Sequence, residues 1–154
     1  MQNEKKFLNI PFTTFASITG LLASVSGIIV ITGWITGITG LKTFGLIGVT
    51  MKVNTAVCFL LAGLALFFLQ RDNRRLNNLL SRLFAAFVVL LGLLTIFQYV
   101  FSVNIGIDEF LFREPENAVD TVHPGRMAPN TALNFVLLGI VLFALSFRKM
   151  GKSL

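Results

Sequence analysis

Residues 83–103 read LFAAFVVLLGLLTIFQYVFSV, an apolar run in which no side chain carries a charge. A helix needs about 20 such residues to cross the hydrocarbon core of a bilayer. Three further runs have the same character, at 13–36, 54–69 and 130–147. Because lipid offers the backbone no hydrogen-bond partner, and because these runs do not alternate as barrel strands do, each is predicted to be a helix. The sequence therefore predicts an all-α membrane protein with four transmembrane helices.

The composition of the chain agrees with this prediction. Of its 154 residues, 55% are hydrophobic and 13% are charged, whereas about 25% of residues are charged in an ordinary soluble domain. The length accommodates a single membrane domain, residues 1–154, and leaves no room for a separate soluble catalytic domain. The run at 13–36 is too long for the apolar region of a signal peptide, so we expect it to be retained as the first span.

The basic residues predict the orientation in the membrane. Most of them flank the expected helices on one side: Lys5, Lys6, Arg71, Arg74, Arg75, Arg82, Arg148, Lys149 and Lys152. Cytoplasmic segments carry such an excess of Lys and Arg, so both termini are expected to be cytoplasmic, with outer loops at 37–53 and 104–129. This distribution also accounts for the net charge of +6, and we therefore expect no nucleic-acid binding.

An internal repeat is visible in the sequence. Residues 51–69 align without gaps on residues 127–145, and both copies begin a helix with Asn-Thr-Ala. Each copy follows an aliphatic run and an outer loop, which predicts two parallel helix–loop–helix repeats. Many secondary transporters are built from inverted repeats instead, so this pattern disfavours a small transporter. Gly63 and Gly139 occupy matching positions and are predicted to be the points at which the two Asn-Thr-Ala helices cross each other.

The Asn-Thr-Ala strings have two interpretations. Asn54 and Thr55 in the first copy, and Asn130 and Thr131 in the second, are predicted to cap the backbone N–H groups at the helix starts. Alternatively, the positive ends of both helices converge on one extracytoplasmic pocket that favours an anion or a carbonyl group. The sequence alone leaves both interpretations open.

A polar cluster is predicted at the outer mouth of the four-helix bundle. Gln98 and Asn134 are expected at similar depth, and their amides should bond to each other or to a neighbouring helix because unpaired amides are costly in a membrane. Above them, Asp120, His123 and Arg126 lie in the acidic outer loop. These five residues are the candidate input site of a sensor. They could equally form a structural hydrogen bond beneath a solvated loop.

No catalytic motif of the common hydrolase, kinase or redox classes occurs in the chain, and we expect no enzyme activity. His123 with nearby acids such as Asp120 resembles a metal site only weakly, so no metal is predicted. No cofactor is indicated by the sequence. Expected partners are the lipid bilayer and either a second copy of the chain or other membrane subunits, since Gly20, Ser24 and Gly27 could form a close-packed dimer face.

Several strings together resemble a known group of membrane regions. These strings include IDEFLFR at 107–113 and HPGRMAPNTA at 123–132. They are similar to the polytopic N-terminal membrane regions of bacterial sensor histidine kinases and of some diguanylate cyclases. The resemblance implies a sensory input domain in the bacterial inner membrane, upstream of PAS, kinase or cyclase modules. No such module lies within the 154 residues, which keeps a structural or accessory subunit of a membrane complex as the alternative.

Overall fold

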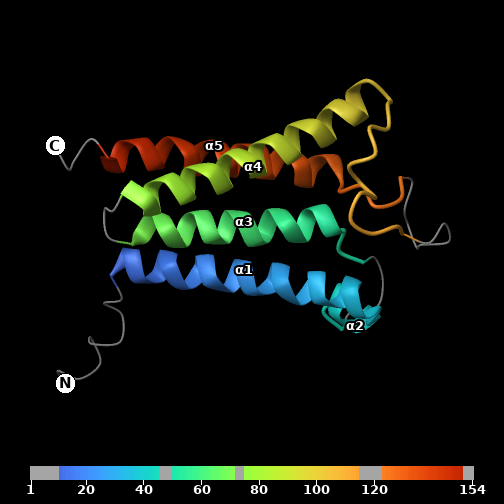
Figure 1. Ribbon diagram of the computed structural model, residues 1–154, viewed down its shortest axis with the longest axis horizontal. Coiled ribbons are helices and arrows are strands. Elements are labelled where there is room, and N and C mark those ends of the chain that lie inside the picture. Colours follow the sequence, from blue (N-terminus) through green and yellow to red (C-terminus); the bar gives the residue numbers. More distant parts are fainter. Residues whose placement is uncertain (1–10, 46–49, 72–74, 115–122, 151–154) are drawn as a thin grey trace, which may run out of the picture.

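The computed structural model describes residues 11–45, 50–71, 75–114 and 123–150. All regular structure in these ranges is helical. In chain order the helices are α1 (Phe12–Thr36), α2 (Thr39–Lys42), α3 (Val53–Gln70), α4 (Arg75–Val100) and α5 (Pro129–Met150). Figure 1 shows that α1 and α4 run toward the end of the molecule at which α3 and α5 begin. We call this end the loop end, because it carries the described parts of the α1–α3 and α4–α5 connections.

Four of the helices are long and apolar enough to cross a membrane: α1, α3, α4 and most of α5. Large apolar side chains point outward from the array, and Leu22, Phe87 and Leu137 are each more than half exposed. A surface of this kind is unfavourable in water and favourable in lipid. The predicted all-helical fold with four candidate spans is therefore confirmed, and it has the form of a multi-pass membrane protein.

Helix α4, the third of the spanning helices, begins at Arg75, well before the start of the run predicted at 83–103. Polar side chains in its first turns find partners on neighbouring helices, which a hydropathy pattern does not register. The Ser81 hydroxyl donates to the carbonyl of Ala65 over 2.8 Å, and Arg82 Nε donates to Ser146 Oγ over 3.3 Å. These bonds connect the start of α4 to both α3 and α5.

The same helix ends at Val100, before the predicted end at Val103. Ser102 adopts a φ of 52°, in the left-handed region that interrupts an α-helix. The short α2 inside the outer loop at 37–53 was not predicted.

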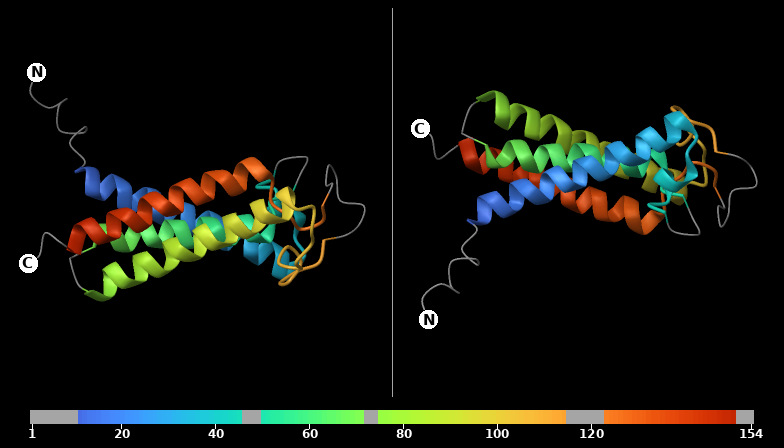
Figure 2. Two further views of the ribbon diagram at one scale, coloured as in Figure 1. Left: turned by 90° about the horizontal axis from the view of Figure 1, so that it is seen from above. Right: turned by 90° about the horizontal axis from the view of Figure 1, so that it is seen from below.

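Helix α3 is the centre of the array. None of its residues is exposed, whereas α1, α4 and α5 all have exposed faces. Helix α1 packs on one side of α3, and α4 with α5 packs on the other. Between their described residues, α1 shares no contact with α4 or α5. The views in Figure 2 are consistent with this open arrangement, so the helices do not close into the expected four-helix bundle.

Small residues bring the helices of each pair close together. A Cβ atom on Gly27 of α1 would lie 2.5 Å from the carbonyl oxygen of Ala56 in α3. A Cβ atom on Gly92 of α4 would lie 2.9 Å from the carbonyl oxygen of Ala132 in α5. Real Cβ atoms essentially never come within 3.0 Å of such neighbours, so both contacts require glycine. This is the packing that small residues permit in membranes.

The predicted crossing of the two Asn-Thr-Ala helices at Gly63 and Gly139 is wrong. Gly63 faces Gly20 of α1, and Gly139 faces α4 near Val89. Each glycine therefore serves the contact with the preceding helix. Helices α3 and α5 meet elsewhere, and the rings of Phe59 and Phe135 lie edge to face there, with centroids 5.2 Å apart. Aromatic rings are too bulky to allow the close approach that the glycines allow in the other pairs.

Candidate functional site

The loop end contains a buried polar cluster centred on Asp108, in the α4–α5 connection. Arg126 Nε donates to Asp108 Oδ2 over 2.7 Å, and Gln98 Nε2 donates to the same oxygen over 3.0 Å. Arg126 Nη2 donates in turn to Gln98 Oε1 over 3.3 Å, and that oxygen also accepts the Ile105 backbone N–H. Exposure is 0% for Gln98, 4% for Asp108 and 6% for Arg126. The end of α4, the loop and the residues before α5 are thus joined by one network.

Because this network is buried, losing one of its members would strongly destabilise the loop. A charge removed from water is tolerated only when it is paired and hydrogen-bonded. Asp108 meets that condition through Oδ2, but its buried Oδ1 has no hydrogen-bond partner among the described residues. Loss of Arg126 would therefore leave the carboxylate without its compensating charge.

A second buried ion pair joins the same loop to the start of α3. Lys52 Nζ donates to both carboxylate oxygens of Glu114, at 2.6 Å for Oε2. The Gly125 backbone N–H donates to Oε2 over 2.7 Å, and the Thr50 hydroxyl donates to Oε1 over 3.1 Å. Burial alone would raise the pKa of the Glu114 carboxyl, but these bonds and the charge of Lys52 outweigh it and lower the pKa below its ordinary value.

The Glu114 pair should make stability depend on pH. Since the folded-state pKa of Glu114 is lowered, the pair stabilises the fold above the ordinary value of 4.5 and loses that effect as pH falls below it. We expect the midpoint temperature of thermal unfolding in detergent to decrease as the pH is lowered from about 5 to about 3. In Glu114→Gln that part of the pH dependence should be missing. An unchanged pH profile in the variant would contradict this account.

Gly125 allows two parts of the loop to pack closely against each other. Gly125 has a φ of 69°, which favours glycine. A Cβ atom at this position would also lie 2.5 Å from the carbonyl oxygen of Asp108. The glycine therefore lets the chain that carries Arg126 pass directly over the chain that carries Asp108.

The predicted capping of α3 is wrong. The residue that precedes the helix is Lys52, and no side-chain hydrogen bond caps this end. Asn54 lies inside the helix and donates through Nδ2 to the carbonyl of Ile107 over 3.1 Å, so it binds the loop instead. Thr55, also predicted to cap, lies one residue further inside. A carbonyl from the folded loop is the acceptor for the amide, which sequence-local reasoning does not include.

The start of α5 differs in part from its prediction. Pro129 is the first helical residue, so Asn130 and Thr131 both lie within the first turn. Asn130 Oδ1 accepts the backbone N–H of Thr131 over 2.9 Å, which satisfies one donor of that turn. The Asn130 side chain is exposed. Its interaction is therefore local, in contrast to that of Asn54.

Two aromatic side chains bind backbone carbonyls at corresponding places. Trp34 Nε1 donates to the carbonyl of Met51 over 3.0 Å, and the Tyr99 hydroxyl donates to the carbonyl of Met127 over 3.2 Å. The ammonium group of Lys42 lies 4.2 Å from the centroid of the Trp34 ring, a favourable cation–π distance. Each aromatic residue thereby fixes the chain that leads into α3 or α5.

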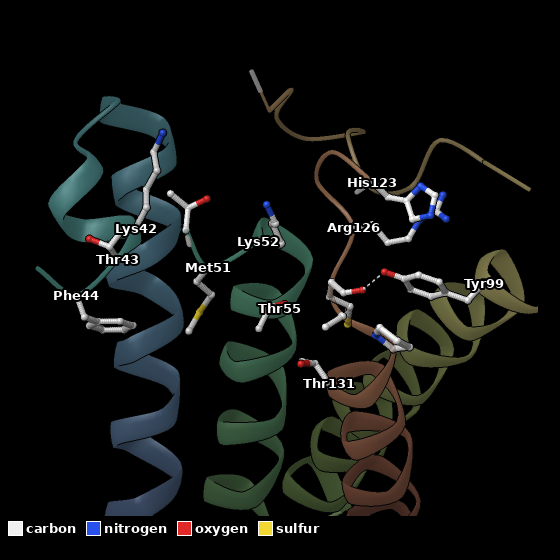
Figure 3. Close-up of a pocket in the computed structure, with 14 residues that line it drawn as sticks. Lys42, Thr43, Phe44, Met51, Lys52, Thr55, Tyr99, His123, Arg126 and Thr131 are labelled. Atoms are coloured by element: carbon white, nitrogen blue, oxygen red, sulfur yellow. Dashed lines mark hydrogen bonds between the residues drawn. The ribbon is translucent and has the colours of Figure 1, made fainter. Parts of the chain in front are cut away.

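A cavity of about 430 Å³ lies between the segment that leads into α3 and the segment that leads into α5. Figure 3 shows it bounded by the segment after α1 on one side, by the start of α3, and by α5 with Tyr99 of α4 on the other side. Its lining includes the residues Lys42, Met51, Thr55, Tyr99, Met127 and Thr131. The cavity therefore touches the described parts of both connections at the loop end.

The structure brings together only part of the predicted input cluster. Gln98 and Arg126 are in direct contact, as described above. His123 is exposed and lies edge to face with the ring of Tyr99, at a centroid distance of 5.7 Å. Asp120 lies outside the described residues. Asn134 is exposed on α5, and among the described residues its amide bonds neither to the fully buried Gln98 nor to a neighbouring helix, so the bond predicted for it is wrong.

Sequence reasoning missed the two carboxylates that organise the site. Asp108 and Glu114 lie in the acidic outer loop and were not among the five candidate input residues, yet both are buried and paired. One feature of the sequence could have indicated them. Lys52 and Arg126 each lie close to the start of a predicted helix, and each requires an acidic partner if it is buried. Among the described residues, no group of three His, Cys, Asp or Glu side chains could hold a metal ion.

The side chains at the loop end are suited to binding a ligand and to holding the loop against the helices. Its charged groups are engaged with each other, and the cavity presents cations, hydroxyl groups and apolar side chains. Comparison of the chain with protein-family models, with curated proteins and with solved structures finds no match.

Proposed function

We propose that this chain is a membrane-embedded sensory input domain. In this proposal a signal received at the loop end is passed along α3 and α5 to cytoplasmic partners. The supporting observation is that the α4–α5 connection is bonded to two helices through buried polar side chains. Asp108 bonds to Gln98 of α4, and the carbonyl of Ile107 bonds to Asn54 of α3. A displaced loop would break these buried bonds unless the helix ends moved with it, which is a physical route for coupling.

We further propose that the helices form two parallel helix–loop–helix repeats. Equivalent contacts support this. Gly27 and Trp34 lie in the first helix of the first repeat, and Gly92 and Tyr99 lie in the first helix of the second repeat. Each pair of equivalent residues is separated by the same 65 residues. The residues that they contact, at the start of the second helix of each repeat or just before it, are likewise separated by one common number of residues. Equivalent residues thus make equivalent contacts, as a duplicated unit would.

The proposed orientation has both termini in the cytoplasm of a bacterium, with the loop end outside the inner membrane. Its support is the charge distribution. Arg71, Arg75 and Arg82 lie near the end opposite to the loop end, whereas Asp108 and Glu114 lie at the loop end. Cytoplasmic segments carry the excess of basic residues. Reporter fusions at the two termini measure this orientation.

A chimera with a histidine-kinase module tests the sensory function. We expect Gln98→Leu and Asn54→Leu to change basal kinase output severalfold, because each removes a bond between the loop and a helix end. The matched control is Asn104→Leu, since the exposed Asn104 amide bonds only to Gly106, two residues away in the same loop. The readout is autophosphorylation in membranes, with thermal unfolding as the test of folding. Parental output from both folded variants would refute the proposal.

One observation favours the alternative of an accessory subunit. Asn134 is an exposed amide on a face of α5 that otherwise presents Leu133, Leu137 and Leu138. Amides in membranes bond across helix interfaces, so a second copy of the chain or another subunit would pack here. If Asn134→Leu abolished assembly in membranes while the loop variants left kinase output unchanged, the accessory role would be favoured.

A further inference from the structure

The start of α3 has unusual requirements for hydrogen bonding. The first N–H groups of any helix lack partners within the helix, and a buried start needs a cap, water or a ligand to satisfy them. Val53, Asn54 and Thr55 are 3%, 6% and 8% exposed, yet no side chain caps this helix. The buried donors therefore call for an acceptor that the described chain does not supply.

Two hydroxyl groups beside the cavity point to the same need. Thr55 on α3 is more than nine-tenths buried and lines the cavity, as does Thr131 on α5. Within the described part of the chain, no hydrogen bond engages either hydroxyl. Figure 3 shows Thr131 directed from α5 toward α3. These hydroxyls occupy equivalent positions of the two Asn-Thr-Ala strings, so a ligand bonded to both would connect the two halves of the molecule.

The charges around the cavity select the ligand. Among the described residues, three cations and no carboxylate line it. Lys52 is balanced by Glu114, and Arg126 is balanced by Asp108, whereas Lys42 contacts only the Trp34 ring among the described groups. Counted over the described residues, one positive charge remains near two helix starts, whose dipoles also favour an anion. A ligand with a single negative charge fits this balance.

The cavity also has an apolar part of its lining, which adjoins the membrane helices. Phe44, Met51, Met127 and Pro129 contribute to this part, and α1 and α5, which lie on opposite sides of α3, do not touch each other. We propose that the cavity binds a monoanionic amphiphile, with an oxyanion head at Thr55 and Thr131 and an apolar tail toward the bilayer. The head is a carboxylate or a phosphodiester. That this ligand is the stimulus rests on the proposed sensory function, but its binding does not.

The single tryptophan provides a direct probe of binding. Trp34 bonds to Met51 and lies under Lys42, and both of these residues line the cavity. The isolated chain in detergent is titrated with oleate, with dioleoyl phosphatidylglycerol, with methyl oleate and with acetate, and Trp34 emission is recorded. We expect saturable changes with oleate or phosphatidylglycerol, and none with methyl oleate or acetate at matched concentrations. A response to oleate alone identifies a free carboxylate ligand, and a response to phosphatidylglycerol alone identifies a lipid headgroup.

The variant pair Thr55→Val/Thr131→Val removes both hydroxyls with little change of shape, and we expect it to weaken binding about tenfold or more. Thr32→Val is the matched control, because the Thr32 hydroxyl bonds within α1 and does not line the cavity. If the double variant does not fold, Lys42→Gln tests the charge instead and should also weaken binding. Equal affinity in the folded variants, or equal binding of methyl oleate, would overturn the inference. Because no kinase output is measured, failure here is distinct from failure of the sensory proposal.

Discussion

Replacing Arg126 by methionine is expected to lower the free energy of unfolding by about 3–5 kcal/mol, because it leaves a buried carboxylate without its partner. Arg126 is 6% exposed and supplies the positive charge that faces Asp108. Its guanidinium group also donates to Gln98 Oε1, which would lose one of its two bonds. The quantity is measured by denaturation with SDS, followed by circular dichroism, in mixed micelles.

Two further variants separate charge burial from general damage to the loop. Removing both charges in Arg126→Met/Asp108→Leu should recover most of the lost stability, since a buried pair replaced by apolar side chains is often neutral. Arg113→Met removes an exposed cation from the same loop and should change stability by about 0.5 kcal/mol or less. A double variant as unstable as Arg126→Met would show that the ion pair does not hold the loop.

The number and position of the spanning helices could be predicted because lipid imposes a simple constraint. Every backbone group must bond within its own helix, so an apolar run of sufficient length has one outcome. The run at 83–103 shows the limit of this reasoning. Its helix extends back to Arg75, because Ser81 and Arg82 bond to neighbouring helices and so tolerate a less apolar environment.

The position of a side chain along its helix could be predicted, but the direction in which it points could not. Gln98 and Asn134 lie near the loop-end termini of α4 and α5, as expected. One is fully buried and the other is exposed. In a soluble helix the apolar stripe identifies the buried face. In a membrane helix both faces are apolar, so the sequence contains little information about which side meets a neighbour.

The candidate site was predicted least well because it depends on contacts between distant residues. Asn54 was interpreted from its neighbours in sequence as a cap, yet its amide bonds to Ile107. Glu114 was not included in the candidate site, yet it meets Lys52 from the other connection. Local patterns describe helix starts in isolation. They do not specify how a long loop folds back over them.

Replacing Gly63 by leucine is expected to separate α1 from α3 and to lower the free energy of unfolding by about 3 kcal/mol or more, beyond the usual cost of overpacking. Even a Cβ atom at this position would lie 2.7 Å from the backbone nitrogen of Ser24 and would contact the carbonyl oxygen of Gly20 more closely still. Backbone atoms cannot rotate away as a side chain can. The Ser24 hydroxyl, which donates to the carbonyl of Leu60 over 3.2 Å, would lose that bond.

The separation can be measured apart from the loss of stability. Cysteines placed at Val30 of α1 and Ala56 of α3, which are buried in the same apolar cluster, report the approach of the two helices through disulfide formation, in a background with Cys58 replaced by alanine. We expect Gly63→Leu to abolish this cross-link. Ala86→Leu places the same leucine side chain at an exposed position of α4 and should preserve both the cross-link and the stability. If Gly63→Leu matched Ala86→Leu in both measurements, the close contact of α1 with α3 would not be what holds α1 in the array. The fold would then depend on α3, α4 and α5 alone, because α1 touches neither of the other two spanning helices.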